Sequence, residues 1–460
     1  MNTAALREAA PGRDDGYLFS RGQAWFAFAM TIGLMMVDYI DRQVIVSLFP
    51  YLKAEWNLSD KQLGGLVSAV SVTVALGAIP VALLADRGSR VRSVVVMALV
   101  WSLASISCMF SRGYGQLLAA RSLVGLGEAG YGSVGAALIA SHFPARLRGA
   151  LLAGFFASAS VGSVLGVLLG GVIAARFGWQ AAFGIVGVPG LVLALLYLKV
   201  RDYPTVKLTP RLDRATSSTR SAAGAIVQAL IRTRTLLWLC IAGAAQLVVV
   251  SAIWSWLPSF LNRVHGVVPE KAAMSAALVV FCGALGSVVW GAVADRAGLR
   301  RPRARLYVVA LLCVASMLVL MLGFGGARLG LAIGAQAQFA LLAAGGFLMT
   351  CTVGPLPAAV IDVVHPGIRA TGASVISLFQ NLFGLAAGPL VAGFLSDAWT
   401  LEFALTAVPA FSLLAAGALL VAARTYEADL QRACQAAQAT ELPAEAPMPA
   451  AVQPARKALA

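Results

Sequence analysis

Runs of about 20 apolar residues recur along this chain from Ala24 nearly to Ala423. A helix of that length crosses the ~30 Å hydrocarbon core of a bilayer. The chain has 460 residues, of which 59% are hydrophobic and 12% are charged, and this composition is typical of a membrane protein. We therefore predict an all-α polytopic membrane protein with twelve transmembrane helices, over approximately 23–52, 60–84, 93–111, 114–141, 149–175, 181–199, 235–262, 272–294, 306–325, 330–360, 370–395 and 402–423.

The twelve predicted spans divide into two groups of six. Residues 200–234 form the longest polar interruption, and we expect them to be a cytoplasmic linker with a short surface helix around 222–231. The expected parts are an N-terminal segment (1–22), two six-helix halves (23–199 and 235–423) and a disordered tail (424–460) that begins with a short helix near 427–437. Residues 1–20 lack the apolar core of a cleavable signal.

The net charge of +15 raises the question of a nucleic-acid partner, but the positions of the basic residues argue against one. With the N-terminus inside, 26 of the 35 Lys and Arg residues fall on the cytoplasmic side, 7 on the outer side and 2 within spans. This skew follows the positive-inside rule. We expect a multi-pass protein of the cell (inner) membrane with both termini in the cytoplasm, and no nucleic-acid partner.

The residues that carry enzyme chemistry are scarce. The three histidines, His142, His265 and His365, all lie at predicted loop ends, and the six cysteines are scattered without disulfide or metal spacing. No Gly-x-x-x-x-Gly-Lys-Ser/Thr loop is present to bind the phosphates of ATP. We expect no catalytic residues, no cofactor and no metal. A membrane-embedded enzyme or receptor remains the competing class, and a channel would be recognised by flux that never saturates.

The loops after spans 2 and 8 carry a repeated motif. They read Asp86-Arg87-Gly88-Ser89-Arg90 and Gly291-Ala-Val-Ala-Asp295-Arg296-Ala-Gly298-Leu-Arg300. The two Asp residues are 209 positions apart, and a weaker pair after spans 4 and 10, Pro144 and Pro366, is 222 apart. The chain is therefore predicted to be a parallel duplication, in which two six-helix halves enclose a central site, as in transporters.

These Asp-Arg-x-Gly-x-Arg loops, together with the twelve spans, resemble the major facilitator superfamily over essentially the whole chain. The first copy departs from the pattern, with Ala82 and Ser89 in place of glycine. The resemblance implies the major facilitator fold and a conformational latch between the halves, formed by Asp86, Arg87, Arg90, Gly291, Asp295, Arg296, Gly298 and Arg300. An Asp at a helix C-terminus needs a compensating partner, which favours the latch over a purely topological charge.

Two ionisable residues, Arg121 and Glu128, lie inside the apolar fourth span. A seven-residue step is almost two helical turns, so both side chains project from nearly one face, roughly 10 Å apart. Each ionisable group costs at least ~2.5 kcal/mol at the centre of a membrane helix. A buried cation and a buried acid on one helix therefore indicate the working centre of the protein.

The first span carries Asp38-Tyr39-Ile40-Asp41-Arg42. The apolar stretch before it, Ala24 to Val37, gives only about 21 Å of helix, so the span must continue through these charges. Asp38 and Arg42 form an i,i+4 pair, and Asp41 points elsewhere. Because spans 1 and 4 run antiparallel, all five charges are predicted to meet. They form either a structural ion-pair cluster or a site that couples protons to a substrate whose anionic group an arginine holds.

The Asp-Tyr-Ile-Asp-Arg run and the Arg-x-x-x-Gly-x-Gly-Glu-Ala-x-Tyr helix resemble the spinster-like branch of the superfamily. This resemblance implies protonation of Asp41 and Glu128, with Arg42 and Arg121 as anion or gating partners. A similar helix occurs in the anion:cation symporter branch, so both branches stay open. The expected substrate contacts also include Asp38, Tyr39 and Tyr131 in the first half and Gln246, Gln380 and Asn381 in the second.

We therefore predict a secondary active transporter, proton-coupled, that moves an organic anion or a lysolipid-like amphiphile by alternating access. The alternative is a symporter of protons with a small sugar acid or another carboxylate. We expect it to act as a monomer in the lipid bilayer. In the fifth span, Gly162, Gly166 and Gly170 recur every four residues and predict a close-packing face.

Overall fold

The computed structural model describes residues 17–202, 233–326, 330–331, 333–364 and 369–441. The first half of the chain forms seven helices, in which α4 and α5 are the two parts of one predicted span. They are α1 (Arg21–Trp56), α2 (Asp60–Arg87), α3 (Arg90–Cys108), α4 (Tyr114–Glu128), α5 (Tyr131–His142), α6 (Ala145–Phe177) and α7 (Trp179–Tyr197).

The second half is helical as well, but its last three spans are divided into shorter pieces. Its elements are α10 (Arg234–His265), α11 (Pro269–Arg300), α12 (Ala304–Gly325), α13 (Ala335–Met349), α14 (Pro355–Val363), α15 (Arg369–Phe379), the π-helix η2 (Gln380–Leu385), α16 (Ala387–Ala398), α17 (Leu401–Ala407), the 3₁₀ turn η3 (Val408–Ala410) and α18 (Phe411–Glu441).

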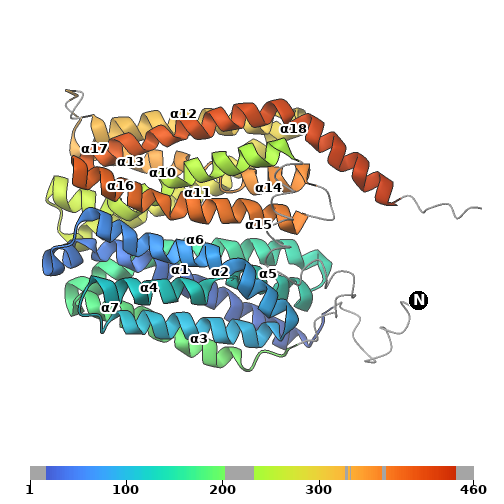
Figure 1. The fold of residues 1–460 in the computed structure, drawn as a ribbon, viewed down its shortest axis with the longest axis horizontal. Helices are drawn as coiled ribbons and strands as arrows, with labels where there is room; N and C mark the ends of the chain where they lie inside the picture. Colours follow the sequence, from blue (N-terminus) through green and yellow to red (C-terminus); the bar gives the residue numbers. More distant parts are fainter. Residues whose placement is uncertain (1–16, 203–232, 327–329, 332, 365–368, 442–460) are drawn as a thin grey trace, which may run out of the picture.

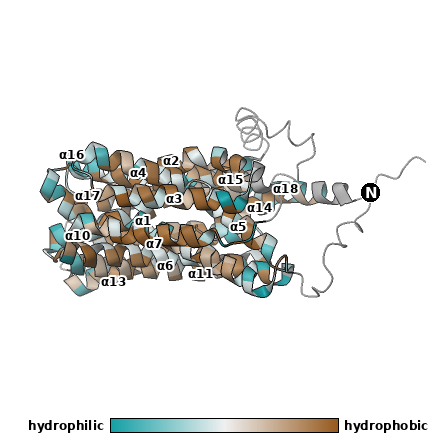
Figure 2. Cartoon of the chain, turned by 90° about the horizontal axis from the view of Figure 1, so that it is seen from below, coloured by the Kyte–Doolittle hydropathy of each residue, from teal (hydrophilic) through white to brown (hydrophobic). Residues whose placement is uncertain are grey.

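Figure 1 shows two bundles lying side by side, with α1 to α7 in the lower one and α10 to α18 in the upper one. We call the end at which α1 and α10 begin the linker end, and the end with the α1–α2 turn, Asn57 to Ser59, the far end. Brown, apolar residues cover the length of the helices in Figure 2, and teal residues gather near the ends. This distribution matches a protein that spans a bilayer.

Eleven of the described helical segments are long and apolar enough to cross a membrane, and α13 is a shorter apolar helix. The prediction of an all-α protein with twelve transmembrane helices is thereby confirmed, since α13 and α14 together occupy the tenth predicted span. The helix expected near 427–437 is the end of α18, which continues unbroken from the last span to Glu441. The predicted surface helix at 222–231 and most of the tail lie outside the described residues.

The glycine face predicted for the fifth span is confirmed. A methyl group added at Gly162, Gly166 or Gly170 would lie against the backbone carbonyls of Met36, Ile40 and Val44 on α1, respectively. Small residues let two membrane helices approach closely and gain van der Waals contact. The backbone of α1 therefore lies directly on α6, which fixes the segment that carries Asp38, Asp41 and Arg42.

Candidate functional site

Arg42 on α1 lies between two carboxylates. Its Nε atom is 3.2 Å from Asp38 Oδ1, one turn earlier on the same helix, and 2.9 Å from Glu128 Oε2 on α4. The i,i+4 pair that the sequence predicts is therefore present. Arg42 keeps 16% of its side chain exposed, whereas Asp38 and Glu128 are almost fully buried.

A second ion pair joins the same two helices. Arg121 Nη1 on α4 lies 3.5 Å from Asp41 Oδ2 and donates to the Asp41 backbone carbonyl at 3.2 Å. Ser105 on α3 donates to Asp41 Oδ1. Arg121 is fully buried and Asp41 is 1% exposed. The sequence did not single out Ser105, because one serine in an apolar span carries no distinguishing signal.

The fourth span breaks at the residue that carries the acid. The helix α4 ends at Glu128, Gly130 adopts a left-handed conformation with φ of 86°, and α5 begins at Tyr131. Glycine accepts this backbone conformation because it has no Cβ atom. The span predicted over 114–141 is present from Tyr114 to His142, but it contains a break after Glu128 that we did not predict. The break leaves Glu128 at a helix C-terminus, where a negative charge is poorly placed.

Glu128 is the least satisfied acid of the cluster. Its two carboxylate oxygens are buried without a hydrogen-bond donor, because Arg42 directs its Nε–H to Asp38 and only approaches Glu128 as an ion-pair partner. Arg121 Nε is likewise buried without an acceptor. Buried polar atoms in native proteins nearly always have partners. The arrangement therefore has capacity for a proton on Glu128 and for an acceptor beside Arg121.

The charges of this cluster do not balance when every group is ionised. Three acids, Asp38, Asp41 and Glu128, face two guanidinium groups, and all lie within α1 and α4. One surplus negative charge in a medium of low dielectric is costly. Binding of a single proton neutralises the cluster.

Two tyrosines were predicted as substrate contacts. Tyr39 lies under Arg42, whose guanidinium carbon is 5.3 Å from the ring centroid. Tyr131 is fully buried, packs edge-on against Trp101 and donates to the Thr31 carbonyl at 2.6 Å. The structure therefore places Tyr39 in the charge cluster and Tyr131 in the packed interior between α1 and α5.

The tenth span breaks at the position equivalent to Glu128. Thr350 lies 222 residues after Glu128, the same separation as between Pro144 and Pro366, and the turn from Thr350 to Gly354 divides α13 from α14. Pro355 at the start of α14 has no N–H, which favours a break here. Gln246 on α10 donates to the Met349 carbonyl at 2.9 Å, while its Oε1 is buried without a partner. The second half thus carries an uncharged counterpart of the charge cluster.

Gln380 and Asn381 begin the π-helix η2. Asn381 donates to the carbonyl of Ser377 in the preceding helix, α15, at 2.9 Å. Gln380 lies against α10, since a methyl group added at Gly243 would be 3.0 Å from Gln380 Nε2. Gly243 is about one turn before Gln246 on α10, so Gln380 contacts α10 within about one turn of Gln246.

The predicted latch loops are described in part, because the side chains of Asp86 and Arg87 lie outside the described residues. In the second loop, Arg305 Nη2 is 3.0 Å from Asp295 Oδ1, and Arg305 Nη1 is 2.7 Å from Asp362 Oδ2. Gly298 packs beside Arg305. These contacts join α11, α12 and α14 within the second half. Gly291 has open space around it, and Arg90, Arg296 and Arg300 lie at the ends of α3 and α11, where Arg296 and Arg300 are exposed.

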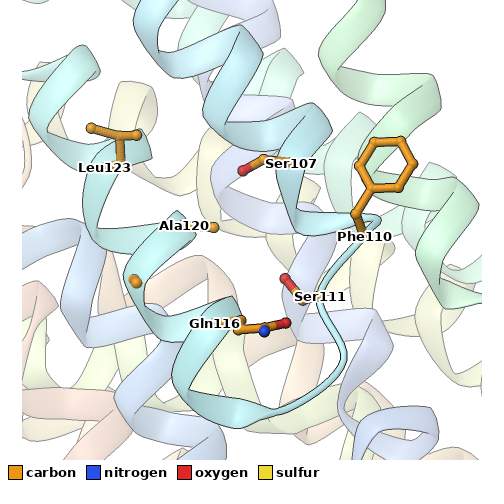
Figure 3. Close-up of a pocket in the computed structure, with 7 residues that line it drawn as sticks. Ser107, Phe110, Ser111, Gln116, Ala120 and Leu123 are labelled. Atoms are coloured by element: carbon orange, nitrogen blue, oxygen red, sulfur yellow. The ribbon is translucent and has the colours of Figure 1, made fainter.

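A surface hollow of about 390 Å³ lies between the end of α3 and the start of α4 (Figure 3). Its lining includes Ser107, Ser111 and Gln116, together with Phe110 and Leu123, whose side chains are exposed at its rim. The predicted site residues do not line it. In the part of the chain that the structure describes, no group of three His, Cys, Asp or Glu residues is placed to hold a metal ion.

Comparisons with known proteins agree with this arrangement. An "MFS-type efflux pump" of Mycolicibacterium smegmatis is 29% identical over 88% of this chain and 92% of its own. A "Probable 4-methylmuconolactone transporter" of Cupriavidus pinatubonensis is 32% identical over 68% and 73%, respectively. The fold matches the crystal structure of a bacterial homolog of the human lysosomal transporter Spinster in an inward-facing and unoccupied conformation, with a TM-score of 0.78. That match has 23% identity and covers 89% of this chain and 99% of the other.

The resemblance to the spinster-like branch is therefore confirmed, and spinster proteins are also among the sequence relatives. The family model of the Major Facilitator Superfamily matches residues 30–387. This chain belongs to the Major Facilitator Superfamily of membrane transporters.

Proposed function

We propose that this protein is a proton-coupled transporter of an organic anion that works by alternating access. The observation that carries the proposal is the position of Arg42 between Asp38 and Glu128 at the break of the fourth span. An arginine that binds two acids in a membrane can exchange one of them for an anionic substrate. An ion-pair cluster that only joined two helices would not need the surplus acid.

The coupling follows from the charges. With Glu128 ionised, the cluster carries a net negative charge and repels an anion. A proton on Glu128 removes that charge and weakens the ion pair between Glu128 and Arg42. Arg42 is then free to bind the anionic group of the substrate. Asp41 keeps Arg121 in place through its carboxylate and its backbone carbonyl. Proton and anion therefore bind together, which makes the transporter a symporter.

The remaining predicted contacts recognise the rest of the substrate. Tyr39 lies beside Arg42, and Gln246 offers an unpaired oxygen to a substrate hydroxyl once the halves move apart. Gln380 and Asn381 stand at the π-helix near the same helix face. We place Tyr131 in the supporting structure instead, because its hydroxyl is already bound to Thr31.

The substrate class that we favour is a carboxylic acid with a ring or several hydroxyl groups. Relatives of this chain include a "Gallate transporter" of Pseudomonas putida, 27% identical, and a "4-hydroxybenzoate transporter" of Pseudomonas aeruginosa, 26% identical. A "Hexuronate transporter" of Bacillus subtilis is 25% identical and supports a sugar acid. A lysolipid-like amphiphile is the second candidate, as the resemblance of the sequence motifs to the spinster-like branch implies, and "Protein spinster homolog 3" of Homo sapiens is 26% identical.

We place the linker end in the cytoplasm and the far end outside, because the basic residues of the sequence are concentrated toward the linker end. This orientation puts both termini of a monomer on the cytoplasmic side of the cell membrane. In the same orientation, protons reach the cluster from the far end whenever that end opens.

Uptake into proteoliposomes tests the proposal. Purified protein is reconstituted, and accumulation of radiolabelled 4-hydroxybenzoate, glucuronate and a lysophospholipid is compared with and without an inward proton gradient. We expect one of the two acids to accumulate only when the gradient is imposed. Gradient-dependent movement of the lysophospholipid alone would favour the second candidate, and saturable uptake that ignores the gradient would exclude proton coupling.

A further inference from the structure

A second ion cluster, separate from the one on α1 and α4, joins the two halves at the far end. Asp60, the first residue of α2, is 2% exposed. Its carboxylate is 2.5 Å from Lys53 Nζ in its own half. From the other half it receives Arg263 Nη1 of α10 at 2.7 Å and Ser396 Oγ of α16 at 2.5 Å. One buried acid therefore holds groups from three helices of both halves.

Asp397 on α16 completes the cluster from the opposite side. Its Oδ1 accepts the backbone N–H of Asp60 and its Oδ2 that of Lys61, both at 2.8 Å. The first N–H groups of a helix have no partner within the helix, and the helix N-terminus carries a partial positive charge. A carboxylate from the second half thus caps a helix of the first half.

The backbones of α2 and α16 are in direct contact beside these charges. A methyl group at Gly64 would clash with the backbone at Pro389, and one at Gly393 would clash with the backbone of Asp60. Ser68, about two turns after Asp60 on α2, donates to the Ala386 carbonyl at 2.6 Å. The polar contacts are therefore part of a closely packed interface that shuts this end of the protein.

The charges divide evenly between the halves. Lys53 and Asp60 belong to the first half, and Arg263 and Asp397 to the second. When the halves separate at this end, each rim keeps one cation and one acid, so neither carries an unbalanced charge into the opening. Charge-assisted hydrogen bonds that form only across the interface stabilise the closed state. Because each rim stays neutral, the free-energy cost of the open state remains small enough for both states to be populated.

We propose that the far-end cluster is a second, reversible latch, distinct from the predicted latch loops, formed by Asp60, Arg263, Ser396 and Asp397. This latch holds the far end closed and sets the balance between the two access states. The latch contacts exist only while this end is closed, so removing them shifts the population toward far-end opening. This inference rests on alternating access and not on the identity of the substrate or of the coupling ion.

Double electron–electron resonance tests the latch. Spin labels are attached at Ala54→Cys and Val268→Cys, two exposed far-end positions in opposite halves. The full chain also carries Cys282→Ser and Cys434→Ala, which remove the two native cysteines that are not buried. Asp60→Asn and Arg263→Gln should each raise the ratio of the long-distance to the short-distance population by about tenfold or more, because each removes a charge-assisted bond. The double variant should shift the ratio by less than the product of the two single effects, because both single variants remove the same contact, the ion pair between Asp60 and Arg263.

The matched control is Glu55→Gln, which removes an acid at the same end whose partners, Trp179 and Gln180, lie in its own half. It should leave the distances unchanged. Asp397→Asn is a second latch variant, and all variants are compared at equal elution volume and helical content. Unchanged distances in folded Arg263→Gln and Asp397→Asn proteins would overturn the latch. Because the distances are read without substrate, they give an answer even if no organic acid is transported.

Discussion

Arg42 Nε lies 2.9 Å from Glu128 Oε2, and Glu128 is the last residue of α4 before the fourth span breaks. The same nitrogen is 3.2 Å from Asp38. One guanidinium therefore serves two acids, and the acid at the helix end has no hydrogen-bond donor of its own. This relationship underlies the coupling of proton and anion that we propose.

Arg121→Lys should weaken transport through loss of geometry, not loss of charge. Arg121 Nη1 contacts both the carboxylate and the backbone carbonyl of Asp41, which leaves Nε without an acceptor. Lysine has a shorter side chain and a single nitrogen, so it cannot hold Asp41 and also offer a second donor to an anion. We expect the apparent KM for the transported acid to rise about tenfold or more, from initial uptake rates. Arg112→Lys, at an exposed position, is the control. An unchanged KM for Arg121→Lys would show that Arg121 is not part of the anion site.

Tyr131→Phe should affect stability and leave substrate affinity unchanged. The change deletes one buried hydrogen bond, to the Thr31 carbonyl at 2.6 Å, and keeps the ring between Trp101 and Phe155. We expect a loss of about 1 kcal/mol, read as a lower thermal unfolding temperature in detergent. A raised KM with unaltered unfolding would show instead that the hydroxyl contacts the substrate.

Gly166→Ala should disturb the contact between α1 and α6. The added methyl group would lie 2.6 Å from the Ile40 carbonyl oxygen, so α1 would have to shift away together with Asp41 and Arg42. Overpacking of this kind costs about 1–3 kcal/mol. Gly154→Ala on the same helix is the control, because its nearest neighbour, Phe28, is 3.9 Å away. Equal stability and equal uptake in both variants would contradict the close-packing role.

Gln246→Leu tests the second half. Leucine is similar in size but cannot donate to the Met349 carbonyl, which would be left unpaired at the break between α13 and α14. We expect the KM of the variant for a hydroxylated acid to be several-fold higher than that of wild type. The KM for benzoate should change less, because benzoate has no ring hydroxyl to bind Oε1. The ratio of the two KM values decides the role, because a purely structural effect would raise both equally.

The sequence was sufficient for the spans and for the pairing of α1 with α4, because hydrophobic length and the spacing of rare charges are local properties. It did not predict the break after Glu128, although Gly130 beside that acid was a usable signal. Gly354 and Pro355 likewise marked the break in the tenth span. These residues tolerate or favour a break without requiring one, so the outcome depended on packing.

The far-end cluster could not be predicted from the sequence. Ser59 and Gln62 form a capping box that marks the start of α2, and this much is readable in the chain. The partners that Asp60 has in the second half, however, come from positions more than 200 residues away. Contacts between the halves are set by how two bundles meet, and hydrophobic periodicity carries no information on that arrangement.

Glu128→Gln is the most direct test of the central claim, that a proton on this acid drives uptake. Proteoliposomes with the variant are assayed in two modes: accumulation driven by an inward proton gradient, and exchange of labelled for unlabelled substrate at equal pH on both sides. Because glutamine resembles the protonated acid, we predict that accumulation falls to the level of empty liposomes while exchange continues. Accumulation against a gradient equal to that of wild type would contradict the account.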